Sequence, residues 1–228
     1  MLGFYDYTTV LTYLSLLSAC TGIVLSLAGQ GHPYMACFCL LFCGFCDAFD
    51  GKVARTKKGR TRMECDYGIQ IDSLSDLVAF GVLPACMGGA LILDSTHLQR
   101  LADLYRDKWF FVMGALVLFA ILLLYVLAAM IRLAYFNVTE EERQKTEGGV
   151  RKYYTGLPVT CAALIFPLVM LAQYLTAADI SLVYIAVALL TALAFVSKLQ
   201  VPKPGLKGIL TMMAAGLVIL AVMIAVAA

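Results

Sequence analysis

Four aspartates in two closely spaced pairs are the residues whose types and spacing best suit catalysis in this sequence. Asp47 and Asp50 lie at the end of one apolar segment, and Asp72 and Asp76 lie at the start of the next. Spacings of three and four residues place each pair on one face of a helix, within about one turn. Because a single basic loop joins the two segments, both pairs lie at the same end of their helices. Two such faces packed together would form one cluster of four carboxylates.

A cluster of carboxylates needs a compensating cation. Carboxylate oxygens with no His nearby favour Mg²⁺ or Mn²⁺, and four of them suit a site of two ions about 3.5 to 4 Å apart. Such a site binds a phosphate or a pyrophosphate. Small residues at Gly51, Ala54 and Gly68 leave room for a ligand or a backbone to come close. Arg55 adds a permanent positive charge beside the acids.

The segments that carry these residues have the composition of a membrane protein. Of 228 residues, 62% are hydrophobic and only 14% are charged, where soluble domains have about 25% charged residues. This composition excludes a soluble enzyme, a disordered chain and a nucleic-acid-binding protein. An Asp at the centre of a membrane helix costs about 2.5 to 3.5 kcal/mol on insertion scales. Four acids at the ends of apolar segments therefore indicate a functional site.

Seven apolar segments predict one all-α integral membrane domain over residues 1–228, a bundle of about six to eight transmembrane helices. No strand-like alternation occurs, so we expect helices alone. The first segment has no basic region before it, and we expect a retained helix there rather than a signal peptide. The segments are residues 8–28, 34–50, 69–93, 109–134, 157–176, 180–197 and 208–228.

Basic residues are concentrated in alternate connectors. Fourteen of the 17 Lys and Arg residues fall on the side of the 51–68 loop, and three fall on the other side. The positive-inside rule then predicts a cytoplasmic N-terminus and 51–68 loop, and an external 94–108 loop. The fourteen are Lys52, Arg55, Lys57, Lys58, Arg60, Arg62, Arg132, Arg143, Lys145, Arg151, Lys152, Lys198, Lys203 and Lys207.

Eight positions with fixed spacing resemble the signature of the CDP-alcohol phosphotransferase family. They read Asp47-x-x-Asp50-Gly51-x-x-Ala54-Arg55, and then Gly68-x-x-x-Asp72-x-x-x-Asp76. The resemblance covers roughly residues 8–170, the expected catalytic core, and leaves further membrane helices in residues 180–228. One departure is the spacer, because twelve residues separate Arg55 from Gly68 and family members usually have about eight.

The resemblance implies the fold of that family and a role for each acid. Asp47, Asp50 and Asp72 would hold two metal ions, Mg²⁺ or Mn²⁺, and Asp76 would help to bind them and act as the general base. An alcohol hydroxyl would attack the lipid-side phosphorus of a CDP-activated donor, and CMP would leave.

The small residues of the signature receive a role by the same resemblance. Gly51, Ala54 and Gly68 would contact the cytidine nucleotide of the CDP-lipid, and Arg55 would lie near its phosphates. The spacing of the residues by itself does not identify cytidine.

Three further strings resemble the phosphatidylserine synthase branch of the family. This likeness implies CDP-diacylglycerol and L-serine as substrates. We also expect a homodimer in the lipid bilayer, with the site facing the cytoplasm by the positive-inside rule. Arg132, with Arg151 or Lys152, would receive the serine carboxylate, and Asn137 and Thr155 are further candidates for serine binding. The strings are residues 72–85, Arg132-Leu-Ala-Tyr-Phe-Asn137 and Tyr154-Thr-Gly-Leu-Pro158.

Two alternatives remain open from the sequence. One is an enzyme of the same family with a different acceptor, glycerol 3-phosphate or inositol phosphate. The other is a cation channel or transporter whose acidic cluster is a permeation site. A permeation pathway predicts acids across the whole bilayer, whereas the remaining half of every apolar segment has no acidic partner.

Overall fold

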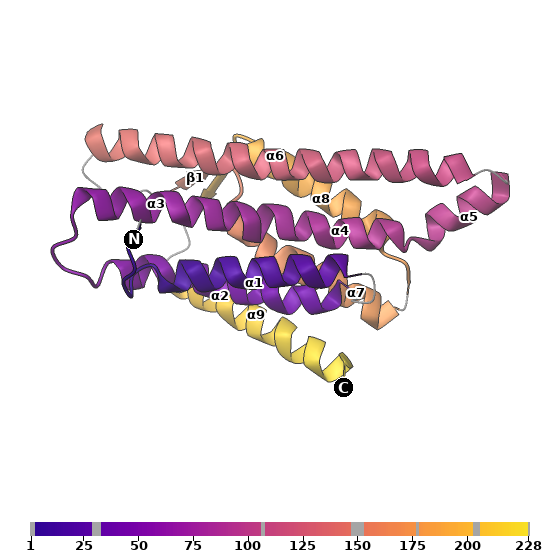
Figure 1. Ribbon diagram of the computed structural model, residues 1–228, viewed down its shortest axis with the longest axis horizontal. Helices are drawn as coiled ribbons and strands as arrows, with labels where there is room; N and C mark the ends of the chain where they lie inside the picture. The colour runs from indigo at the N-terminus through magenta and orange to yellow at the C-terminus, as the bar shows by residue number, and fades with distance from the viewer. Residues whose placement is uncertain are drawn as a thin grey trace.

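Helices arranged along one long axis make up most of the computed structural model (Figure 1). The structure describes residues 3–28, 33–105, 108–146, 153–176, 178–202 and 206–227. The main helices are α1 (Val10–Leu27), α2 (Tyr34–Ala54), α3 (Arg62–Asp76), α4 (Leu83–Leu93), α6 (Lys108–Thr146), α7 (Ala162–Thr176), α8 (Ser181–Val196) and α9 (Leu206–Ala227). The shorter elements are α5 (Thr96–Tyr105), the π-helical turn η1 (Leu77–Val82), the 3₁₀ turn η2 (Val159–Cys161), β1 (Tyr153–Thr155) and β2 (Gln200–Pro202).

The apolar helices of the described residues fall in the seven segments that the sequence predicts. Four are long and apolar enough to cross a membrane, and three are shorter. This arrangement confirms the expected class of all-α polytopic membrane protein. The long ones are Val10–Leu27, Tyr34–Ala54, Arg62–Leu104 and Lys108–Arg143, and the shorter ones are Val159–Ala172, Ser181–Val196 and Leu210–Ala225.

The third helix begins seven residues before the apolar segment that predicts it. A capping box starts it, in which the Glu64 N–H donates to Thr61 Oγ1 (3.2 Å) and the Thr61 N–H donates to the Glu64 carboxylate (2.7 Å). The π-helical turn η1 then continues α3 into α4 without a break. Asp72 and Asp76 therefore lie well inside one long helix rather than at its start.

A short antiparallel ladder between β1 and β2 contradicts the expectation of helices alone. Thr155 lies opposite Gln200, and the backbone N–H of Gly156 donates to Leu199 O (2.8 Å). Strands of three residues are too short to produce an alternating pattern that a sequence can reveal. The ladder fixes the segment before α7 to the end of α8.

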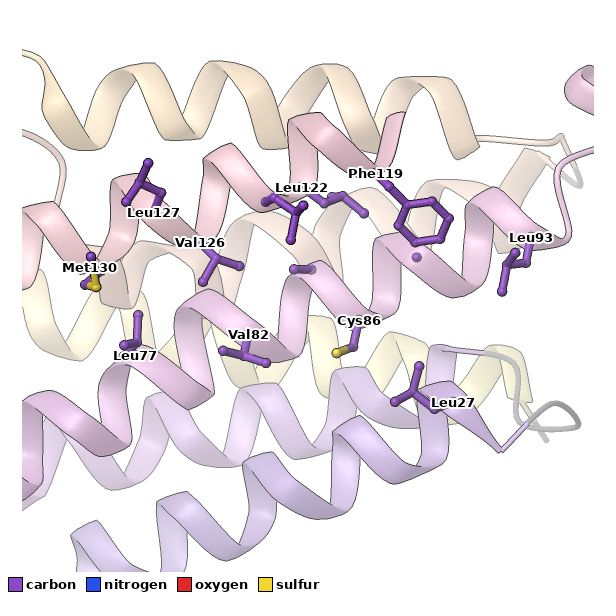
Figure 2. A pocket seen from close by; sticks show the side chains of 13 residues that line it. Leu27, Leu77, Val82, Cys86, Leu93, Phe119, Leu122, Val126, Leu127 and Met130 are labelled. Carbon is purple, nitrogen blue, oxygen red and sulfur yellow. The ribbon is translucent and has the colours of Figure 1, made fainter. Parts of the chain in front are cut away.

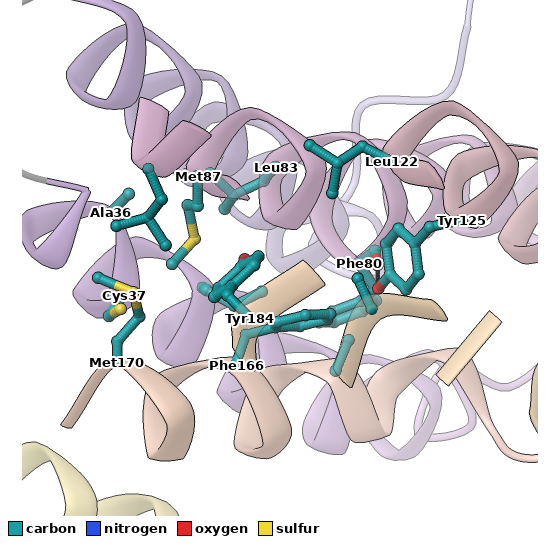
Figure 3. Close-up of a cluster of buried hydrophobic side chains, with 14 of the residues drawn as sticks. Ala36, Cys37, Phe80, Leu83, Met87, Leu122, Tyr125, Phe166, Met170 and Tyr184 are labelled. Atoms are coloured by element: carbon teal, nitrogen blue, oxygen red, sulfur yellow. Dashed lines mark hydrogen bonds between the residues drawn. The ribbon is translucent and has the colours of Figure 1, made fainter. Parts of the chain in front are cut away.

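The core is built from aromatic side chains that also fix the helix carrying two of the acids (Figure 3). The hydroxyl of Tyr125 in α6 donates to Phe80 O (2.5 Å), and that of Tyr184 in α8 donates to Pro84 O (2.8 Å). The two acceptor carbonyls lie in η1 (Phe80) and just after it (Pro84). A π-helical turn breaks the regular helical hydrogen-bond pattern, and two buried hydroxyls satisfy carbonyls at this break.

An apolar groove of about 570 Å³ lies between α4 and α6 and reaches Leu27 at the end of α1 (Figure 2). Along η1 and α4 its lining extends from Leu77 to Leu93, and along α6 it extends from Phe119 to Met130. Leu77 directly follows Asp76. The groove therefore begins at the level of the acidic cluster and continues toward the opposite end of the helices.

Candidate active site

The four aspartates lie within electrostatic reach of one another. The carboxyl groups of Asp50 and Asp72 lie close enough to interact with each other. Asp47 interacts electrostatically with Asp72, and Asp76 interacts with all three of the others. Helix α2 and the helix formed by α3 and η1 both pack against α1, which brings one pair of acids toward the other.

The acidic cluster is partly buried and has no basic ion-pair partner among the described residues. Asp76 is only 8% exposed, and the other three side chains are half-buried. In the part of the chain that the structure describes, the Lys and Arg ion pairs involve other acids. Buried like charges are unfavourable unless a proton or a cation lies between them.

These carboxylates have the donor chemistry of a site for hard divalent cations, which take oxygen ligands. Within residues 3–28, 33–105 and the other described ranges, no three His, Cys, Asp or Glu side chains are grouped closely enough to hold one ion. The donor set fits a metal, and the geometry with which it would bind one stays a prediction.

Two contacts set the rotation of the helix that carries Asp72 and Asp76. The hydroxyl of Ser75 donates to Thr12 O in α1 (3.2 Å). The turn η1 follows directly after Asp76, and its Phe80 carbonyl accepts from the Tyr125 hydroxyl. Ser75 is itself buried. The face with the two acids is thus held toward α2 by contacts on both sides.

Each glycine of the signature lies against an arginine guanidinium. A Cβ at Gly51 would lie 3.5 Å from Arg55 Nη1, and a Cβ at Gly68 would lie 2.9 Å from Arg60 Nη2. The sequence predicts a role near the phosphates for Arg55, whereas Arg60 is only one of several basic residues in the 51–68 loop. The longer spacer between the half-motifs is the signal that could have directed attention to Arg60.

The N-terminal segment is fastened to the loop between α2 and α3, a contact that the sequence does not reveal. Lys57 Nζ lies 2.5 Å from Asp6 Oδ2 and 2.7 Å from Glu64 Oε1. The hydroxyls of Tyr13 and Tyr67 are 3.0 Å apart. The Lys57 ammonium, with help from Thr8, lowers the pKa of Asp6 to about 2. We call this group of contacts the N-terminal latch.

Asn137 reaches the acidic helix directly. Its Nδ2 donates to Ser73 Oγ at 2.7 Å, and Ser73 is the residue after Asp72. This contact places one of the expected serine-binding residues beside the cluster. Thr155 lies in β1, where its backbone pairs with Gln200.

Arg132 is buried in α6 and is held by the segment that precedes α7. Its Nε donates to Leu157 O (3.2 Å), and its guanidinium carbon lies 5.0 Å from the centre of the Phe136 ring. Cys161 lies within electrostatic reach of both Arg132 and Asp47. Arg132 is therefore on the side of the acids. Arg151 and Lys152 are outside the described residues.

Comparison with known proteins identifies a family for this sequence. Residues 7–196 match the CDP-alcohol phosphatidyltransferase family, a range that extends beyond the expected end of the core at residue 170 and includes α8.

The chain is 34% identical over 164 residues to CDP-diacylglycerol--serine O-phosphatidyltransferase of Saccharomyces cerevisiae, which covers 70% of this chain and 51% of the yeast protein. It is 31% identical over 193 residues to archaetidylserine synthase of Methanothermobacter thermautotrophicus, covering 83% of this chain and 68% of that protein. It is 28% identical over 152 residues to CDP-diacylglycerol--serine O-phosphatidyltransferase of Mycobacterium leprae, covering 66% and 43%.

The matched region spans about half the length of the yeast relative. The family match at residues 7–196 includes all four aspartates of the acidic cluster and both arginines that lie against the glycines. On the match of 190 of its 228 residues, from 7 to 196, the chain belongs to the CDP-alcohol phosphatidyltransferase family.

Proposed function

We propose that this protein transfers the phosphatidyl group of CDP-diacylglycerol to the hydroxyl of L-serine, giving phosphatidylserine and CMP. The observation that carries the proposal is the meeting of Asp47, Asp50, Asp72 and Asp76 in a cluster without a basic ion-pair partner among the described residues. Family membership supplies the reaction class, and the names of three similar proteins all refer to serine.

The metal part of the proposal follows from the donor set. The family is generally dependent on divalent metal ions, and carboxylate oxygens favour Mg²⁺ or Mn²⁺ over softer metals. Asp47, Asp50 and Asp72 would hold two such ions, with Asp76 as a further ligand. When bound, the ions would neutralise negative charge on the pyrophosphate as CMP leaves.

Asp76 is the residue we assign to proton transfer. It is the most buried of the four acids, with 8% of its surface exposed. As general base it would take the proton of the serine hydroxyl while the oxygen attacks the lipid-side phosphorus. The bond that breaks joins this phosphorus to the oxygen that leaves with CMP.

The donor would extend from the polar end of the helices into the apolar groove. Gly51, Ala54 and Gly68 would contact the cytidine nucleotide, with Arg55 near the phosphates. The groove begins at Leu77, one residue beyond Asp76, so an acyl chain attached to a phosphate at the cluster could enter it. The volume of about 570 Å³ is within the range of small-molecule sites.

The acceptor would bind between α6 and the segment before α7. Arg132 offers a guanidinium whose fork matches a carboxylate, and Asn137 is already in contact with the helix of the acids. Thr155, and Arg151 beyond the described residues, complete the proposed serine site. The polar end with these groups would face the cytoplasm by the positive-inside rule, and we expect the protein to form a homodimer in the membrane.

A screen of acceptors tests this function. Protein purified in detergent should release CMP from CDP-diacylglycerol only when L-serine and Mg²⁺ or Mn²⁺ are both present. A chelator should stop the release, and an excess of divalent metal should restore it. Release with glycerol 3-phosphate or inositol phosphate, but not with L-serine, would refute the acceptor assignment. Cation flux into proteoliposomes with no CMP release for any acceptor would refute the transferase reaction itself.

A further inference from the structure

Arg60 joins the two halves of the signature although it belongs to neither. Its Nη1 donates to Ala54 O at the end of α2 (3.4 Å), and its Nη2 donates to Glu64 O in α3 (3.2 Å). The same Nη2 lies 2.9 Å from the position that a Cβ would have at Gly68. Its guanidinium therefore fills the space that the missing side chain of Gly68 leaves open.

The position of Arg60 relative to the acids follows from helix geometry. Ala54 lies one turn beyond Asp50, and Gly68 lies one turn before Asp72. At a rise of about 1.5 Å per residue, the four residues of each interval span roughly 6 Å. The guanidinium thus spans the two helices about one turn outward from the contact between Asp50 and Asp72.

The charge of Arg60 has no acidic partner among the described residues, unlike those of Lys57 and Arg62. Lys57 pairs with Asp6 and Glu64, and Arg62 pairs with Asp66. The two hydrogen bonds of Arg60 go to neutral carbonyls, and one of them is long. Its Nε–H is buried and has no acceptor in the described part of the chain. Buried donors are rarely left without a partner, and an anion is the partner that a guanidinium binds best.

Arg55 has a matching place on the other half of the signature. Its guanidinium lies against Gly51, with Nη1 3.5 Å from the Cβ position, and it forms no ion pair among the described residues. Two guanidinium groups thus lie against the two signature glycines. One of these glycines is in each helix that carries a pair of acids. A pyrophosphate bound to metal ions at the acids would find positive charge on its outer side as well.

We infer that Arg60 is a second phosphate-binding arginine, which contacts the pyrophosphate of the CDP-activated donor together with Arg55. The inference rests on the proposed function, because it takes the donor to be a cytidine diphosphate ester. It gives the longer spacer between Arg55 and Gly68 a purpose: the additional residues let the chain turn back so that Arg60 reaches between the helices.

Nucleotide binding to purified protein tests this inference without the need for an acceptor. CDP affinity is measured at a fixed Mg²⁺ concentration for the wild type, Arg60→Gln and the control Arg62→Gln. Arg62 is a suitable control because its side chain is 87% exposed and pairs with Asp66. We expect Arg60→Gln to weaken CDP binding at least tenfold, or about 1.4 kcal/mol, and Arg62→Gln to change it less than twofold.

A second pair of readouts separates binding from a purely structural role. Arg60→Gln should raise the KM for CDP-diacylglycerol and leave the KM for serine nearly unchanged, and Arg60→Lys should lie between the wild type and Arg60→Gln because lysine keeps the charge without the fork. A folded Arg60→Gln protein with wild-type CDP affinity and a lowered melting temperature would overturn the inference. If Arg60→Gln does not fold, unchanged CDP affinity in Arg60→Lys would overturn it. A wild-type protein that binds no CDP would instead refute the proposed function.

Discussion

Replacing Gly156 by Ala is a sharp test of how the acceptor side of the site is held. Gly156 has a φ of +79°, a conformation that costs a residue with a side chain about 1 to 2 kcal/mol. A Cβ there would lie 2.5 Å from Phe195 O and 3.2 Å from Ser197 O. Both neighbours are backbone carbonyls at the end of α8, so neither can move aside as a flexible side chain would.

The substitution should therefore displace the segment before α7 from the end of α8. Two backbone hydrogen bonds are at risk, from Gly156 N–H to Leu199 O (2.8 Å) and from Leu157 N–H to Ala194 O (3.1 Å). Each contributes about 0.5 to 1.5 kcal/mol net. Together with the backbone strain, we expect a loss of about 3 kcal/mol of stability. The Leu157 carbonyl that accepts from Arg132 would move as well, so the KM for serine should rise.

Gly59→Ala is the matched control for this prediction. Gly59 has a similar φ of +75°, but nothing lies within 4 Å of its Cβ position, so only the backbone strain of about 1 to 2 kcal/mol applies. Thermal unfolding of both variants in the same detergent gives the comparison. Gly156→Ala should lower the melting temperature clearly more than Gly59→Ala. Equal shifts would refute the contact argument, and an unchanged KM for serine would refute the link to Arg132.

Three further predictions concern the acids, the N-terminal latch and the core. Asp76→Asn should reduce CMP release by at least a hundredfold, because an amide cannot accept the serine proton, while CDP binding stays within a few-fold of the wild type. The latch should be insensitive to pH between about 5 and 9. Asp6 has a lowered pKa of about 2, so its contribution is complete above its ordinary value near 3.8 and is lost only as the pH falls through 2. Lys57 has a raised pKa through Asp6 and Glu64, so its contribution is complete below its ordinary value of 10.5 and is lost only above it. Tyr125→Phe removes the donor to Phe80 O and should destabilise the protein by about 1 to 3 kcal/mol, with a lower kcat because η1 directly follows Asp76.

Each of these predictions has a measurement that can contradict it. Loss of CDP binding in Asp76→Asn would place this residue in donor binding rather than in proton transfer. The stability difference between the wild type and Asp6→Asn, followed by thermal unfolding, should be constant from pH 5 to pH 9, and a decline within that window would contradict the pKa argument. Tyr135→Phe is the control for Tyr125→Phe, since Tyr135 is 55% exposed. Equal effects of the two tyrosine substitutions would contradict a special role for the buried hydroxyl.

The expected boundaries of the helices show where hydropathy is informative and where it is not. The apolar segments predict the seven apolar helices found among the described residues, because the bilayer demands a minimum length of apolar sequence. The expected start of α3 and the expected end of α6 were wrong by several residues, because both helices continue into polar sequence. Capping at Thr61 and an ion pair between Glu140 and Arg143 stabilise those extensions, and neither contributes to hydropathy. The amphipathic helix α5 escaped notice for the same reason.

The expected site divides in a similar way. Each pair of acids was predictable because spacing along one helix determines which side chains share a face. The contact between Asn137 and Ser73 joins residues far apart in the sequence, and the resemblance to a known family suggested Asn137 without indicating what it touches. Arg60 lies outside the signature, so the resemblance assigned it no role, and the longer spacer was the one sign that this loop differs.

The sequence alone therefore determined the membrane setting, the sided distribution of charge and the pairing of the four acids, because each depends on composition or on the geometry of a single helix. Only the tertiary structure decided that Arg60 lies against Gly68, that Lys57 joins Asp6 to Glu64, and that Gly156 is pressed against the end of α8. Those contacts arise from single side chains or carbonyls of separate elements, and their positions depend on how the helices pack against one another.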